Sequence, residues 1–83
     1  MGLKLAVKAH RDGDLRRAEI DYRRAFDQEQ DSPVFYQNYG ALLRSLERID
    51  EAIHLYEQGL QKYPGNLNIS TNYANAIRAL KPS

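Results

Sequence analysis

The chain of 83 residues has no cysteine, no tryptophan and only two histidines. Without cysteine, it cannot form a disulfide, a thiolate nucleophile or the common kinds of structural zinc site. The histidines, His10 and His54, stand far apart and form no HExxH pair, so we expect no metal and no cofactor. A chain without cysteine also suits a reducing compartment, and we expect a cytoplasmic protein.

An excess of charge and a long apolar run are missing as well. Twelve basic and eleven acidic side chains give a net charge of +1, which does not favour nucleic-acid binding. No stretch approaches the roughly 18 apolar residues of a membrane-spanning helix, and the start, Met1-Gly2-Leu3-Lys4, lacks the pattern of a secretory signal. We therefore expect no nucleic-acid partner and no membrane partner.

The chain also lacks the residue groups that enzymes use. Its serines and its single threonine, Thr71, have no histidine and carboxylate arranged to activate them, and its glycines form no phosphate-binding loop. Asp12 with Asp14 and Asp50 with Glu51 look like carboxylate pairs, but Asp14 and Asp50 are better explained as acidic residues that favour helix N-termini. We expect no enzymatic activity.

The main feature that is present is an internal repeat with a period of 34 residues. The identical residues at this offset are Ala18 and Ala52, Tyr22 and Tyr56, Asn38 and Asn72, Tyr39 and Tyr73, Arg44 and Arg78, and Leu46 and Leu80. Small residues also align with small ones, as at Ala6, Gly40 and Ala74. Such regularity indicates one supersecondary unit that is stacked on copies of itself.

The segments between the turns have the periodicity of helices. Apolar residues recur at spacings of three and four, which predicts five helices, near 2–12, 14–28, 33–46, 49–62 and 67–80. Asp31-Ser32-Pro33 is a turn followed by a proline suited to a first helical position, and Tyr63-Pro64-Gly65-Asn66 is a clear break. The connections are short, so we expect successive helices to be antiparallel neighbours.

The repeated small and large residues predict how these helices pack. We expect Ala6, Gly40 and Ala74 to lie where one helix approaches its partner closely. Ala18 and Ala52 should do the same on the second helix of each pair. The tyrosines beside them are expected to fill the adjoining holes as core residues and not to form a ligand cage. They are Tyr22, Tyr39, Tyr56 and Tyr73.

This pattern resembles the tetratricopeptide repeat family. The residues at that family's large, large, glycine, large, alanine, aromatic and proline positions are Tyr36, Tyr39, Gly40, Leu43, Ala52, Tyr56 and Pro64. The resemblance implies an all-α fold: an α-solenoid of antiparallel helix pairs in a right-handed superhelix, with five helices. Two departures are Gln30, where a closing proline would stand, and Glu47, where a turn glycine would stand.

The resemblance also sets the expected domain organisation. We expect a single domain over residues 1–83, with a first repeat at 1–32, a second at 33–66 and a half-repeat or capping helix at 67–80. Such stacks usually need about three repeats, so we expect an excerpt of a longer array or multidomain protein. The helix sequences are similar to bacterial tetratricopeptide segments that accompany glycosyltransferase-type domains. The similar segments are Ala9-His10, Ala18-Glu19, Tyr22-Arg23 and 72–76.

Asparagine recurs where the core does not require it. Asn38 and Asn72 each precede a core tyrosine, and Asn75 lies on the same side of its helix. The first helix of each pair, at 2–12, 33–46 and 67–80, should line the concave surface of the stack. There, asparagine amides can pair with the C=O and N–H of an extended peptide. In O-linked N-acetylglucosamine transferases, which belong to the same family, asparagines at this place hold extended peptides. The alternative is a solvated polar face inherited by duplication of the repeat.

The charges differ between first and second helices. The first-helix segments carry Lys4, Lys8, Arg11, Arg44 and Arg78 against Asp12 alone. We therefore predict a polar, mildly basic groove for an acidic or extended peptide of another protein. Its predicted site residues are Asn38, Asn72, Asn75, Arg44, Arg78, Gln37 and Lys4. The arginines of segment 14–28 are instead expected to pair with neighbouring acids on a solvated face.

A second function from a different class stays open. The chain could be a structural spacer, or a self-association module whose exposed end helices stack on copies of themselves. The half-repeat at 67–80 motivates this alternative. Molar mass in solution distinguishes it from peptide binding by a monomer.

Overall fold

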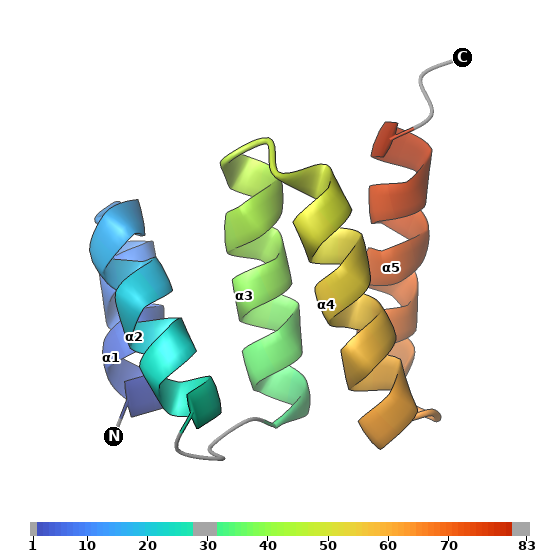
Figure 1. Ribbon diagram of the computed structural model, residues 1–83, viewed down its shortest axis with the longest axis horizontal. Coiled ribbons are helices and arrows are strands. Elements are labelled where there is room, and N and C mark those ends of the chain that lie inside the picture. Colours follow the sequence, from blue (N-terminus) through green and yellow to red (C-terminus); the bar gives the residue numbers. More distant parts are fainter. Residues whose placement is uncertain (1, 28–31, 81–83) are drawn as a thin grey trace.

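The computed structural model describes residues 2–27 and 32–80, and these form five α-helices with no strand. The helices are α1 (Gly2–Arg11), α2 (Leu15–Asp27), α3 (Pro33–Ser45), α4 (Ile49–Lys62) and α5 (Leu67–Leu80) (Figure 1). The expected all-α helical repeat is confirmed, with described helix ends within one residue of those predicted from the sequence. The predicted end of the second helix at residue 28 lies outside the described residues.

The helices form two antiparallel pairs followed by a single helix (Figure 1). Helix α1 packs against α2, α3 packs against α4, and α5 packs against both α4 and α3. The first helices α1, α3 and α5 contact one another in series, whereas the backbones of α2 and α4 make no contact. We call the surface formed by α1, α3 and α5 the first-helix face.

The turns inside the two pairs are the same structure, 34 residues apart. Gly13 and Glu47 both adopt the left-handed backbone, with φ of 84° and 62°. After each of them an N–H reaches back to close the helix: Asp14 donates to the Ala9 carbonyl and Arg48 to the Leu43 carbonyl, at 2.9 and 2.8 Å. This is the Schellman ending of a helix, which glycine adopts without strain and glutamate does not.

The starts of α3 and α5 are also equivalent. Phe35 N–H donates to the Ser32 hydroxyl at 3.4 Å, and Ile69 N–H donates to the Asn66 side-chain oxygen at 2.9 Å. These side chains satisfy N–H groups that a helix start leaves without partners. Pro33 occupies the first turn of α3, as the sequence predicted.

The core is built from small residues that face tyrosine rings. Ala6, Ala18 and Ala52 are fully buried. A Cβ added at Gly40 would lie 2.2 Å from Cε1 of Tyr56, so α3 approaches α4 as closely as only glycine allows. A Cβ at Gly59 would lie 2.8 Å from Cγ of Tyr36. The tyrosines predicted for the core are buried, except Tyr73, which is half-buried.

One packing prediction was wrong. Ala74 was expected at a close helix approach, but it is exposed. Its equivalent Gly40 is covered by the Tyr56 ring of the following helix, and the described part of the chain has no helix after α5. Two large apolar side chains of α5 are exposed as well, Leu67 at 80% and Leu80 at 46%.

Candidate functional site

The first-helix face carries the predicted asparagines. Asn38 and Asn72 lie at equivalent places on α3 and α5, and both are half-buried, as are Asn75 and Gln37. The Asn72 amide donates to the Asn68 carbonyl of its own helix at 2.9 Å. This leaves one amide N–H and the side-chain oxygen of Asn72 for another partner. The structure thus places Asn38 on α3 and Asn72 and Asn75 on α5, two first helices that contact each other, and no hydrogen bond between described residues joins these side chains.

The two predicted arginines differ in their surroundings. Arg44 is half-buried and lines an open hollow of about 680 Å³ between α3 and α5, whereas Arg78 is exposed and does not line it. Burial raises the pKa of Tyr56, and the Arg44 charge opposes part of that rise, which places Arg44 near the Tyr56 hydroxyl. The hollow is also lined by Ala41, Ser45, Glu47, Ile49 and Ala79. Lys4 lies in α1, but its side chain is outside the described residues.

A tyrosine hydroxyl bridges each junction between successive units. Arg23 Nε of α2 donates to the Tyr39 hydroxyl of α3 at 3.4 Å. At the next junction the Tyr73 hydroxyl of α5 donates to Glu57 of α4 at 2.9 Å. Arg23 and Glu57 are equivalent in the repeat but opposite in charge. Sequence comparison showed the repeated tyrosines and missed their partners, because a search for like residues does not pair arginine with glutamate.

Glu19 and Arg48 form a second bridge at the first junction. Arg48 Nη1 donates to Glu19 Oε1 at 2.8 Å, and the Tyr39 hydroxyl donates to Glu19 Oε2 at 3.2 Å. Arg48 also forms an ion pair with Glu51. The hydrogen bond from Arg48 lowers the pKa of Glu19 and that of Glu51 below the usual value. No sequence signal pointed to this pair, since its members are far apart in the chain and stand among ordinary polar residues.

The charges of α2 follow the sequence prediction in part. Arg17 pairs with Asp21 at 3.3 Å and Arg23 pairs with Glu19 at 3.4 Å, both one turn apart. The expectation of a solvated face is wrong for Asp21, which is only 2% exposed. Asp21 stands one period before Leu55, so it occupies a position that the repeat turns inward.

Aromatic side chains fill the junction between α2 and α3. Tyr22 stacks on Tyr39 with ring centroids 5.2 Å apart, and Phe26 stacks on Phe35 at 5.8 Å. Phe35 also meets Tyr36 edge-on at 5.0 Å. At the equivalent junction between α4 and α5, the place of Phe35 is taken by Ile69, which is fully buried. The first junction is therefore built on rings and the second on a smaller aliphatic side chain.

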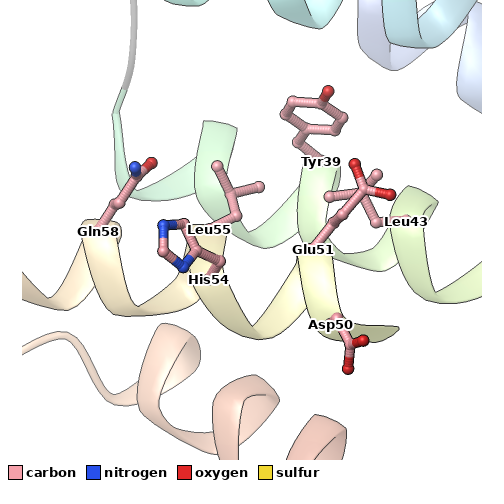
Figure 2. Close-up of a pocket in the computed structure, with 7 residues that line it drawn as sticks. All are labelled: Tyr39, Leu43, Asp50, Glu51, His54, Leu55 and Gln58. Atoms are coloured by element: carbon pink, nitrogen blue, oxygen red, sulfur yellow. The ribbon is translucent and has the colours of Figure 1, made fainter. Parts of the chain in front are cut away.

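A groove runs between α2 and α4, over α3. It consists of two hollows of about 380 and 340 Å³ that share Tyr39, Leu55 and Gln58. Figure 2 shows the first hollow, with Tyr39 and Leu43 on α3 beside α4, and with Asp50 pointing away from Tyr39. The second hollow is lined in addition by Arg23, Phe26, Asp27 and Phe35. We call these two hollows together the α2–α4 groove.

Two further properties concern the described residues alone. None of the described helices combines the length and the apolar character needed to cross a membrane. Within ranges 2–27 and 32–80, histidine, aspartate and glutamate nowhere gather in a group of three that could hold a metal ion.

Comparisons with known proteins give a match to a family model. The chain has no significant similarity to a curated protein or to a solved structure. A family model described as tetratricopeptide repeat matches residues 33–76, which is more than half of the chain.

Proposed function

The chain belongs to the tetratricopeptide repeat family, and we propose that its first-helix face binds an extended peptide segment of a partner protein. Repeats of this family generally serve as scaffolds for protein–protein interaction and are generally not catalytic, which fits the expected lack of enzymatic activity. A cytoplasmic location and a link to a glycosyltransferase-type domain are parts of the same proposal. They rest on the composition and on the resemblance of the helix sequences.

The equivalent placement of Asn38 and Asn72 is the observation that carries this proposal. Both lie on first helices, which contact each other in series, so their amides face the same side of the stack. Each amide offers a donor and an acceptor to a peptide unit. Two or three such hydrogen bonds, at about 0.5–1.5 kcal/mol each, give weak binding that tolerates many sequences.

Contacts within the stack support a concave shape on this side. The first helices touch in series while α2 and α4 stay apart, so the stack is narrower along the first-helix face. The exposed basic residues Lys8, Arg11 and Arg78 belong to these helices, with Asp12 as their acidic neighbour. Acidic peptides would therefore associate faster than basic ones, by complementarity of charge.

The experiment is a binding titration with labelled extended peptides rich in aspartate and glutamate, followed by fluorescence anisotropy. The variant Asn38→Ala/Asn72→Ala should weaken binding by about tenfold, which corresponds to about 1.4 kcal/mol. The control Gln58→Ala changes an exposed amide in the α2–α4 groove and should leave binding unchanged. Equal affinity of the double variant and the wild type, with helical content intact, would exclude the asparagines as the site.

Self-association through α5 is a second candidate function. The exposed Leu67, Ala74 and Leu80 favour it, because Ala74 stands where α3 has the tyrosine-covered Gly40. Light scattering over a range of concentrations measures the molar mass directly. A dimer that Leu80→Glu converts to a monomer would support this function, and a strict monomer at all concentrations would rule it out.

A further inference from the structure

The α2–α4 groove lies on the opposite side of the stack from the first-helix face. Its floor is apolar, with Phe35 fully buried, Leu43 3% exposed and Leu55 9% exposed. The rings of Phe26 and Phe35 stack between α2 and α3, and the backbones of α2 and α4 do not contact each other. The groove therefore lies in the space between α2 and α4, beside the rings of this junction.

An exposed aromatic ring borders the groove on the α2 side. Phe26 stacks on Phe35 at 5.8 Å with one side of its ring, yet 45% of its surface is exposed. Asp27 follows it at the end of α2, is exposed, and has no ion pair with another described residue. An aromatic face beside a free carboxylate is an arrangement that attracts a guanidinium or ammonium group.

The cations already present do not neutralise this rim. Arg23 is held by Glu19 and the Tyr39 hydroxyl, and Arg48 is held by Glu19 and Glu51. Four carboxylates, those of Glu19, Asp27, Asp50 and Glu51, thus stand against two guanidinium groups around the groove. Asp27 and Asp50 have no ion pair with a described residue, and Asp50 points away from Tyr39 (Figure 2). The charge of the groove is the reverse of that expected on the first-helix face.

We propose that the α2–α4 groove is a second binding site, for a peptide segment that carries a leucine-like side chain next to an arginine or lysine. The apolar side chain lies over Leu55 and Tyr39, where it leaves water. The guanidinium or ammonium group lies against the exposed face of Phe26 and pairs with Asp27. The groove is separate from the first-helix face and prefers peptides of the opposite charge. Both sites can therefore be occupied at once.

Three short blocked peptides of equal length test this proposal by NMR titration of the labelled full chain. The first holds one leucine flanked by arginines, the second has glutamates in place of the arginines, and the third has serine in place of the leucine. We expect the first to shift the resonances of Leu43, Leu55 and Phe26, with a Kd at these resonances at least about tenfold lower than that of the other two. Shifts centred on Asn38 and Asn72 would overturn the proposal.

Charge-reversal variants give the second measurement. Asp27→Lys should weaken binding of the arginine peptide by about tenfold or more, since it replaces an attraction by a repulsion. Asp12→Lys makes the same change in net charge on an exposed residue outside the groove and should have little effect. Circular dichroism checks that both variants keep their helices.

Several outcomes would contradict the proposal. These are an equal loss in both lysine variants, equal affinity for the glutamate peptide at the resonances of Leu43, Leu55 and Phe26, or no shift of these resonances with the arginine peptide. A dimer in light scattering whose interface covers Leu55 and Phe26 would identify a second copy of the chain as the occupant instead. The groove is tested at Leu43, Leu55 and Phe26, and the first-helix face is tested at Asn38 and Asn72, so the two proposed sites succeed or fail separately.

Discussion

Arg48, at the turn before α4, donates a hydrogen bond of 2.8 Å to the carboxylate of Glu19 on α2. The backbones of α2 and α4 do not contact each other, so this pair joins the two helices through side chains. The Tyr39 hydroxyl donates to the same carboxylate at 3.2 Å and ties α3 into the link. Glu19 therefore connects the first helix pair to both helices of the second.

This link should make the free energy of unfolding decrease as the pH becomes acidic. Arg48 lowers the pKa of Glu19 in the folded state below 4.5, its ordinary value. The stabilisation is therefore complete above that value and is lost as pH falls through the lowered pKa of the folded state. Glu19→Gln should reduce the free energy of unfolding by about 1 kcal/mol or less at neutral pH, because Arg48 is 31% exposed.

Thermal denaturation of wild type and Glu19→Gln, measured between about pH 7 and pH 3, checks this prediction. The difference in Tm should be constant near neutrality and should shrink in acid, where the wild-type carboxyl becomes protonated. A difference that grows as the pH falls would show that the carboxylate does not stabilise the fold.

The contact between Gly40 and Tyr56 predicts a specific intolerance. Gly40→Ala would place a Cβ 2.2 Å from the Tyr56 ring, which is fully buried and has no room to move. We expect a loss of about 1–3 kcal/mol in the free energy of unfolding, measured by urea denaturation. Gly65→Ala is the control, since a Cβ there meets nothing within 4 Å.

A double variant separates this clash from other effects of the alanine. Tyr56→Leu removes the ring, so Gly40→Ala should cost less in that background than in the wild type. If the two changes prove strictly additive, the ring is not what excludes alanine from position 40.

The sequence predicted most of the fold because packing repeats every 34 residues. Gly40, Ala52 and Tyr56 obey the same steric requirement as their equivalents, so matching like with like found them and the helices around them. The prediction of close packing at Ala74 failed, because a position in the repeat does not say whether a following helix covers it. The candidate asparagines were found in the same way, as repeated residues that the core does not need.

The sequence did not predict the features in which equivalent positions of the two repeats carry residues of different charge or kind. Arg23 and Glu57 hold equivalent tyrosines with opposite charges, and Glu19 meets Arg48 across a junction that no local pattern marks. The α2–α4 groove is lined by Phe35, whose equivalent at the next junction is the aliphatic Ile69. Such differences between repeats cannot be read from a search for similarity between them.

Glu47 should be a site of stabilising mutation. It has a φ of 62°, a conformation that costs a residue with a Cβ about 1–2 kcal/mol, and its equivalent is Gly13. Glu47→Gly should raise the free energy of unfolding by up to about 1 kcal/mol, because the greater freedom of glycine in the unfolded chain offsets part of the gain.

The matched control for this prediction is Gly13→Ala. A Cβ at Gly13 meets nothing within 4 Å, so any loss of stability there arises from the backbone conformation alone. We expect Gly13→Ala to lose about 1 kcal/mol in urea denaturation. Loss of stability in Glu47→Gly would mean that the Glu47 side chain contributes more than its strained backbone costs.

The buried tyrosines should make the fold sensitive to alkali. Burial raises the pKa of Tyr22 to about 12, against an ordinary value of 10.0. Between these values the unfolded chain releases the Tyr22 proton and the folded chain retains it, so stability falls as the pH rises. Urea denaturation at pH values from about 8 to 11 should show this loss, and Tyr22→Phe should reduce its slope. Other titrating groups, including lysines, are common to both proteins, so the difference in slope isolates Tyr22. Equal slopes would mean that the Tyr22 hydroxyl ionises as readily in the folded chain as in the unfolded one, and that its burial does not hold the proton.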